Sequence, residues 1–212
     1  MYMNNFNILP CRLVRFTVSV IVFTIVFLLC ALHHVKAEAI IIDGKFGDWD
    51  QKVEILVDPV DAEDGFVDLG SIRYASDGHH LHLMLELRRV VNLQAMDGQL
   101  TIYFDADGDV TTGRTDGPLP GADLAIVCTA PTNRRTEAAG MGLAVEVYHR
   151  SPTNDAVWHE SPYALGISFA PTIASPQSEL RIERGVRLHD RALFAGKKVT
   201  MRIIATTVAG DV

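Results

Sequence analysis

Residues 81–87 read LHLMLEL, and this stretch decides the fold. A leucine stands at every odd position, while His82, Met84 and Glu86 lie between them. Successive side chains of a β-strand point to opposite faces of a sheet, so this alternation predicts a strand that buries one face. An amphipathic helix would instead repeat its apolar residues every three or four positions. The stretch therefore indicates a β-protein.

The same alternation recurs through the chain, with Gly, Pro, Asp or Asn in nearly every gap. Residues 186–194 are the only candidate segment for a short helix. So many short strands without a βαβ rhythm predict an all-β fold, a jelly-roll-like antiparallel β-sandwich, with a closed barrel as the alternative. The expected strands are residues 39–42, 53–57, 72–75, 81–87, 100–104, 124–128, 143–148, 179–183 and 199–205.

The N-terminus has the pattern of an export signal. An apolar run of 17 residues, 16–32, follows a cationic lead and is followed by Val-Lys-Ala at 35–37. This pattern predicts a signal peptide over 1–37 that forms a signal helix and is cleaved after Ala37, so that residues 38–212 become secreted or periplasmic. The alternative is an uncleaved membrane anchor, because the run approaches the length that spans a bilayer. The domain is expected either to end at Val212 or to be truncated there.

The charge of the chain limits the classes of partner that it can bind, and its cysteine content limits how it can be stabilised. The chain has 19 Lys and Arg against 26 Asp and Glu, and no acid precedes residue 38, so the exported part is strongly acidic. Such a surface argues against nucleic acid or an anionic membrane as the partner. Cys128 is the single cysteine after the leader, which leaves no internal disulfide. An exported domain of this kind depends on its core or on a metal for stability.

The sharpest chemical feature is an acidic loop, DADGDVTTG at 105–113. Asp105, Asp107 and Asp109 alternate directly after an expected strand, and their mutual repulsion would be relieved by a cation. Carboxylate and carbonyl oxygens are the ligands that Ca²⁺ prefers. Position six of the loop is Val110 rather than glycine and the flanks read as strands, so this is not an EF-hand.

Asp123, at the start of the returning strand, is expected to supply a further calcium ligand, and Asp116 is a weaker candidate. The alternative interpretation of the loop is a solvated Asp-Gly turn in which Asp105 and Asp109 accept backbone N–H groups. The sequence leaves both interpretations open.

Two histidines suggest a second metal site. His80 and His82 lie on one face of the predicted strand, with Met84 and Glu86 beyond them, and such a set suits zinc or copper. The favoured alternative is an ordinary polar face turned to solvent. A haem site would need a Met/His axial pair, and nothing in the sequence selects one.

A sugar site would need flat aromatic faces beside polar groups. The candidates gather in one part of the chain, although a half-buried core tryptophan is the competing explanation for the largest of them. They are Trp158, Tyr148, Tyr163, Asn154 and Arg150.

Catalytic motifs give no support for an enzyme. The chain has no G-x-S-x-G, no H-E-x-x-H and no glycine-rich phosphate loop before a helix. Glu86 and Glu179 could pair for glycoside hydrolysis, but acids on the outer faces of strands are expected to be ordinary surface. We therefore expect a noncatalytic protein.

Several short sequence motifs, taken in their order along the chain, resemble those of carbohydrate-binding module family 9 and its DOMON-like relatives. These modules are found in secreted bacterial proteins, often ahead of a hydrolase domain. The resemblance covers roughly residues 40–205. It rests on Ile42-Asp43-Gly44, Gly47-Asp48-Trp49, Asp68, Tyr74, DGHHLHLMLEL at 77–87, Val91–Gln94, LTIYFDADGDVTTG at 100–113, Gly121–Leu124 and APTIASPQSELRIER at 170–184.

The resemblance implies a β-sandwich, noncatalytic carbohydrate binding and bound calcium. We accordingly expect an exported module that binds a polysaccharide or glycan and serves a hydrolase, either on a longer chain or as a separate partner. The alternatives are a structural or protein-interaction sandwich without a sugar site, and a His-based metal or haem redox domain.

Overall fold

The computed structural model describes residues 39–49, 54–60, 67–130, 143–151, 154–188, 190–196 and 198–206. The chain divides into two units, 1–38 and 39–212, and only the second contains described residues. The predicted signal helix and its cleavage site therefore lie outside the described residues. Among the residues described, no helix has the length and apolar character needed to cross a membrane.

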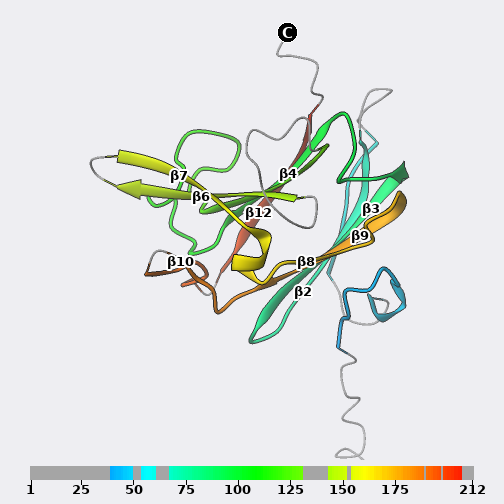
Figure 1. Cartoon of the computed structure of the whole chain (residues 1–212), viewed down its shortest axis with the longest axis horizontal. Coiled ribbons are helices and arrows are strands. Elements are labelled where there is room, and N and C mark those ends of the chain that lie inside the picture. Colours follow the sequence, from blue (N-terminus) through cyan, green and yellow to red (C-terminus); the bar gives the residue numbers. More distant parts are fainter. Residues whose placement is uncertain are drawn as a thin grey trace, which may run out of the picture. The chain divides into compact units, whose positions relative to one another are not determined.

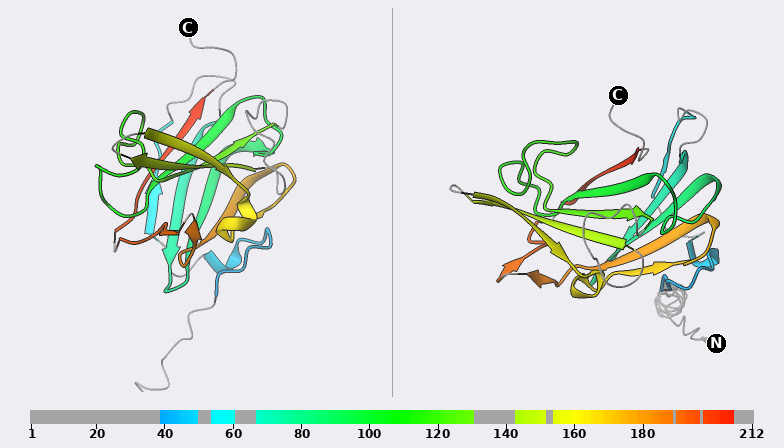
Figure 2. Two further views of the ribbon diagram at one scale, coloured as in Figure 1. Left: turned by 60° about the vertical axis from the view of Figure 1, so that its left-hand side comes forward. Right: turned by 45° about the horizontal axis from the view of Figure 1, so that its top comes forward.

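Two five-stranded antiparallel sheets make up the second unit (Figures 1 and 2). The first sheet has the order β1 (Glu54–Val57), β2 (Leu69–Ser76), β3 (His80–Val91), β9 (Ser175–Glu183) and β8 (Ser168–Ala170). The second has the order β12 (Thr200–Thr206), β4 (Gln99–Asp105), β5 (Leu124–Thr129), β6 (Leu143–Ser151) and β7 (Asn154–Glu160). A hairpin of β10 (Arg187–Leu188) and β11 (Arg191–Ala192), and the 3₁₀ turns η1 (Gly47–Trp49) and η3 (Pro162–Leu165), complete the described elements.

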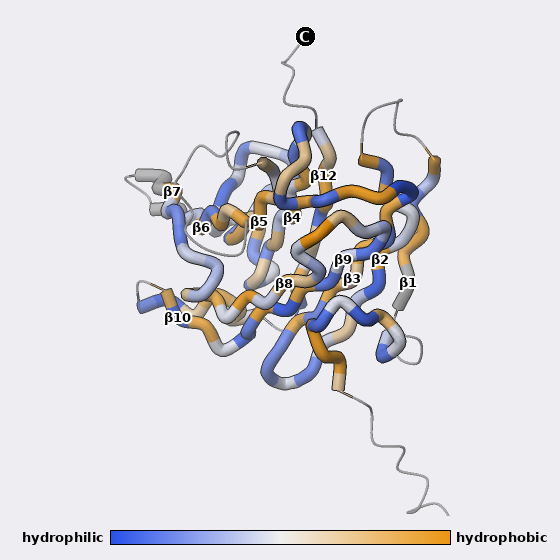
Figure 3. Tube along the Cα trace, turned by 45° about the vertical axis from the view of Figure 1, so that its right-hand side comes forward, coloured by the Kyte–Doolittle hydropathy of each residue, from blue (hydrophilic) through white to orange (hydrophobic). Residues whose placement is uncertain are grey.

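A large apolar core joins the inner faces of the two sheets, which confirms the predicted β-sandwich. The odd-numbered leucines of β3 point into this core, as their alternation predicts. Figure 3 shows apolar residues recurring along the strands, while the turns between them are mostly hydrophilic. The two sheets share no described strand, so the described part does not close into a barrel. The facing core residues are Leu81, Leu83, Leu85, Leu87, Leu180 and Ile182 from the first sheet and Leu100, Ile102, Phe104, Leu124, Ile126, Leu143, Val145 and Val147 from the second.

The outer face of the first sheet is covered by the N-terminal segment 39–49, and this differs from the sequence prediction. A strand was expected at 39–42, but these residues form no strand. Instead the N–H groups of Asp43 and Gly44 donate to Oε1 of Glu179 over 2.9 and 2.6 Å. The Trp49 indole Nε1 donates to the other oxygen of the same carboxylate over 2.8 Å. The segment is held to the sheet by a side chain rather than by strand pairing.

Several groups on this outer face that were expected to face solvent are buried. Glu179 is 1% exposed and lies opposite Met84, which is 2% exposed; His82 is 4% exposed. The predictions of an ordinary surface glutamate at 179 and of a polar outward face on β3 are therefore wrong. Glu86 stays half-buried and accepts a hydrogen bond from the Ser71 hydroxyl over 2.7 Å.

The candidate segment 186–194 does not form a helix, because it contains the β10–β11 hairpin. Asp190 adopts a positive φ of 64°, which a helix interior excludes and which suits a tight turn. Val186, Leu193 and Phe194 are buried in the main core, so the apolar spacing that suggested a helix serves a folded-back loop. Strands β7 and β8 were not predicted, since neither shows a clear apolar alternation.

Candidate metal centre and ligand pocket

The end of β4 and the start of β5 bring three aspartates together. Phe104 pairs with Leu124 in the antiparallel register, and the backbone N–H of Asp123 donates to the Phe104 carbonyl over 2.7 Å. Asp105 and Asp123 therefore lie side by side, and Asp107 returns to them two residues after the strand. Carboxylate oxygens of Asp105, Asp107 and Asp123 lie within 4.8 Å of one another, a grouping that can hold a metal ion. The convergence of these three predicted ligands is confirmed.

Backbone N–H groups hold each carboxylate in place. Asp105 is 4% exposed and its Oδ1 accepts from Gly108 over 2.7 Å. The fully buried Asp123 accepts from the Ala106 N–H over 2.9 Å through Oδ2. Asp107, at the rim, accepts from the Asp109 N–H over 2.9 Å. The cluster is therefore fixed by the fold rather than by flexible side chains.

A cation from the β10–β11 hairpin already contacts the cluster. Nη2 of Arg191 lies 2.5 Å from Oδ1 of Asp123 and 3.1 Å from Oδ2 of Asp107. Burial raises the pKa of Asp123, while the Ala106 N–H and Arg191 oppose that rise. With all three carboxylates ionised, one guanidinium leaves two negative charges without compensation. Sequence reasoning missed Arg191, because nothing in its segment links it to residues 68 to 84 positions earlier.

The fourth predicted calcium ligand, Asp109, does not join the cluster. Its Oδ1 instead accepts from the Thr111 N–H and hydroxyl over 2.9 and 2.6 Å, and these bonds lower its pKa. Asp116 is also apart, with its carboxylate 3.5 Å from Nε of Arg114. The turn interpretation thus describes Asp109, because the chain bends away after Gly108 at a positive φ of 74°.

The three remaining aspartates fit a hard divalent cation. Ca²⁺ takes six to eight oxygen ligands in irregular geometry, and three carboxylates supply the charged part of such a set. The uncompensated charge of two matches the charge of the ion. Asp105 and Asp123 are buried, where unpaired charge is costly, so the donor set is suited to an ion.

The predicted sugar-binding aromatics are not brought together. Val147 pairs with Trp158, and directly opposed residues share a face of the sheet, so Trp158 lies on the core side and packs there. Tyr148 points to the opposite face and is 2% exposed. Its hydroxyl donates to Oε2 of Glu146 over 2.7 Å, and the Arg114 guanidinium lies 5.5 Å from its ring centroid. Burial and the bond to Glu146 raise the pKa of Tyr148.

The other three predicted sugar contacts are also spread out. Tyr163 is 66% exposed and lies in η3, after the C-terminal end of β7. Asn154 and Arg150 lie at the far end of the β6–β7 hairpin, about 20 Å away along a seven-residue strand. Their side chains are outside the described part. No single described surface combines these residues into an aromatic platform.

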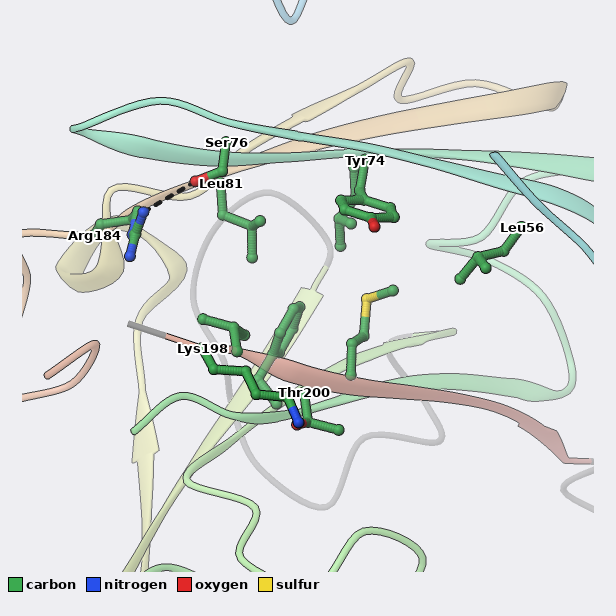
Figure 4. Close-up of a pocket in the computed structure, with 11 residues that line it drawn as sticks. Leu56, Tyr74, Ser76, Leu81, Arg184, Lys198 and Thr200 are labelled. Carbon is green, nitrogen blue, oxygen red and sulfur yellow. Dashed lines mark hydrogen bonds between the residues drawn. The ribbon is translucent and has the colours of Figure 1, made fainter. Parts of the chain in front are cut away.

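A cavity of about 410 Å³ lies between the edges of the two sheets, where β1 and β2 face β12 (Figure 4). Arg184 and Lys198 are on one side of it and Leu56 is on the other, with Tyr74 between them on the upper wall. Arg184 donates to the Ser76 hydroxyl over 3.0 Å, which holds the guanidinium at the rim. The cavity was not predicted, because its lining comes from five strands and two connections. The remaining lining residues are Leu81, Leu83, Phe104, Val199, Thr200 and Met201.

The aspartate cluster and this cavity are neighbours. Phe104 lines the cavity and precedes Asp105 directly. A Cβ placed on Gly108 would lie 3.4 Å from the Lys198 carbonyl, and one on Gly196 only 2.2 Å from the Asp107 carbonyl. The acidic loop therefore packs against the segment that carries Lys198 to the cavity, and glycine at 196 permits the close approach.

Comparison with models of known families, with curated proteins and with solved structures gives no match for this chain.

Proposed function

We propose that this chain is an exported, noncatalytic carbohydrate-binding module that is stabilised by Ca²⁺ at Asp105, Asp107 and Asp123. The proposal of a bound cation rests on the buried aspartate cluster, which keeps two excess negative charges after Arg191 is counted. When bound, Ca²⁺ would supply charge compensation and would order the loop. Glycan binding is supported by the order of the motifs, which resembles that of carbohydrate-binding module family 9, and by the β-sandwich fold.

We place the glycan in the cavity between the sheet edges rather than on the separated aromatics. Tyr74 offers an aromatic ring, and Ser76 and Thr200 offer hydroxyl groups of the kind that bond sugar hydroxyls. Arg184 and Lys198 form no ion pair with any described carboxylate, and the exported part is otherwise acidic. Two cations that lack a carboxylate partner among the described residues favour, at this concave site, a glycan that carries carboxylate or sulfate groups.

The experiment is retention on immobilised polysaccharides, comparing an acidic glycan such as polygalacturonate with a neutral one such as cellulose. The parent should be retained on the acidic glycan, and Lys198→Gln should elute earlier. Lys45→Gln is the matched control, because Lys45 is exposed, pairs with Asp43 and does not line the cavity. Retention that is equal for parent and Lys198→Gln would move the site away from this cavity, and no retention on any glycan would reject the function.

The second candidate is a protein-interaction sandwich without a sugar site. The separation of Tyr148 and Trp158 onto opposite faces favours it, since the predicted platform is missing from the described surface. In this case the acidic surface would bind a protein, and a hydrolase is the partner that the resemblance suggests. Failure on all glycans, together with binding to a co-exported hydrolase, would favour this candidate.

A further inference from the structure

We propose that Asp77, His80 and His82 form a second metal site, for a transition ion of the Zn²⁺ class, at the turn between β2 and β3. The three side chains each bring one ligand atom into a group whose members lie within 4.8 Å of one another. This site shares no residue with the aspartate cluster at the end of β4 and does not depend on the proposed function.

The separations fit chelation better than hydrogen bonding. Nδ1 of His80 lies 3.7 Å from Oδ1 of Asp77, and Nε2 of His82 lies 3.6 Å from Oδ2. Both distances are too long for a hydrogen bond. Ligand atoms about 2.0 to 2.1 Å from a tetrahedral Zn²⁺ lie roughly 3.3 Å apart, close to these values. The three groups surround a position that a small ion can occupy.

Asp77 is held in place before any ion binds. Its Oδ1 accepts from the backbone N–H groups of His79 and His80 over 2.7 and 2.6 Å, which fixes the carboxylate across the turn. Oδ2 is thereby directed toward His82. Arg184 lies nearby, but it donates to the Asp77 carbonyl over 3.4 Å and forms no ion pair with the carboxylate. The carboxylate therefore stays available as a ligand.

His82 supplies the second, independent observation. It is 4% exposed, yet its Nδ1 has no hydrogen-bond partner among the described atoms, and its Nε2 is beyond bonding distance of Asp77. A buried imidazole that serves only the core would normally have its polar atoms satisfied. His80, two positions before it on the same face of β3, is partly exposed and leaves a path for the ion. Two imidazoles and one carboxylate select Zn²⁺, Cu²⁺ or Ni²⁺ over Ca²⁺.

The test is a calorimetric titration of the tag-free full chain with ZnCl₂. The protein is first stripped of metal with a chelator, and excess CaCl₂ is then added to occupy the aspartate cluster. One equivalent should bind, and Co²⁺ in its place should give visible d–d absorption bands. His80→Gln and Asp77→Asn should each weaken Zn²⁺ binding by at least tenfold. The side chains of His80 and Asp77 are both partly exposed, and asparagine at position 77 keeps the Oδ1 acceptor of the turn. Both variants are therefore expected to fold, and circular dichroism checks this.

His79→Gln is the matched control, because His79 is the adjacent exposed histidine and is outside the cluster. It should bind Zn²⁺ as the parent does. Equal losses in His79→Gln and His80→Gln, or no Zn²⁺ uptake by the parent, would overturn the site. Zn²⁺ binding that survives His80→Gln but disappears in Asp107→Asn would place the ion in the aspartate cluster and overturn it too. Loss of calcium stabilisation alone would affect only the proposed function.

Discussion

The guanidinium of Arg191 donates to the fully buried carboxylate of Asp123 over 2.5 Å, from a hairpin 68 residues further along the chain. This cation neutralises part of the charge that an ion would otherwise balance. Arg191→Gln should therefore destabilise the metal-free protein by about 3 to 5 kcal/mol, the usual cost of leaving a buried charge unpaired. Calcium should restore more stability in this variant than in the parent, because the full negative charge then faces the ion.

Melting temperatures with Ca²⁺ and with EDTA measure both effects. Arg187→Gln is the control, since Arg187 lies on the same hairpin but is exposed and donates to the Asp190 carbonyl. An Arg191→Gln protein that melts like the parent in EDTA would show that the cluster needs no neutralising cation.

Calcium itself should stabilise the parent. An ion at 100 times its dissociation constant adds about 2.7 kcal/mol to the free energy of unfolding. For a protein of this size that corresponds to roughly 2–4 °C of melting temperature per kcal/mol. Asp107→Asn should abolish most of the shift, whereas Asp116→Asn, at an exposed aspartate outside the cluster, should keep it. A parent whose melting temperature is the same in Ca²⁺ and EDTA would exclude a structural ion.

Removal of calcium should also weaken ligand binding at the cavity. Gly108 and Gly196 allow the acidic loop to pack closely against the segment that carries Lys198, so a loosened loop would no longer position that cation. We expect EDTA to reduce retention on the acidic glycan in the parent but to change little in Lys198→Gln, which has already lost the contact. An equal EDTA effect in both proteins would indicate that the cation and the cavity are not coupled.

The Trp49–Glu179 hydrogen bond should stabilise the whole N-terminal segment. Trp49→Phe keeps most of the buried ring but leaves Oε2 of Glu179 without its donor, at a cost of about 1–3 kcal/mol for an unsatisfied buried group. Urea unfolding followed by circular dichroism measures this loss. A Trp49→Phe protein with unchanged stability would mean that water replaces the indole donor.

Glu179 should also give the stability a definite pH dependence. Burial raises its pKa above the ordinary value of 4.5, although the Trp49, Gly44 and Asp43 N–H groups act against that rise. The folded state then binds its proton more tightly than the unfolded state, so this contribution is present below pH 4.5 and is lost as pH rises through the folded pKa. Unfolding free energies across this range should show the decline in the parent and a flatter profile in Glu179→Gln. The same slope in both proteins would assign the pH effect to another group.

Short sequence patterns were enough to predict the strands that bury one face and the acidic loop. The leucines of LHLMLEL identify the core face of β3, and DADGDVTTG identifies two cluster residues that lie close in sequence, Asp105 and Asp107. The burial of Glu179 could not be foreseen, because its carboxylate accepts from Asp43 and Trp49, which lie 136 and 130 residues earlier in the chain. Arg191 is likewise a tertiary neighbour without a local signal.

The error over the aromatic platform has a different cause. The alternation of β6 already places Tyr148 opposite to Val145 and Val147, so its separation from the core side follows from sequence. The face of Trp158 is fixed only by its pairing with Val147, and a shift of one residue would have turned it outward beside Tyr148. Register between strands is the information that the linear pattern lacks.

The strand order of the first sheet has a consequence for how the protein is made. β3 pairs with β2 on one side and with β9 on the other. β9 begins only at residue 175, after the whole β4–β7 meander. Until that part of the chain is synthesised, β3, the longest of the described strands, presents a row of unpaired amides and carbonyls, which is a template for joining other chains. Nascent or C-terminally shortened forms are thus the species most prone to aggregate, and a chaperone that shields them would act before residue 175 appears.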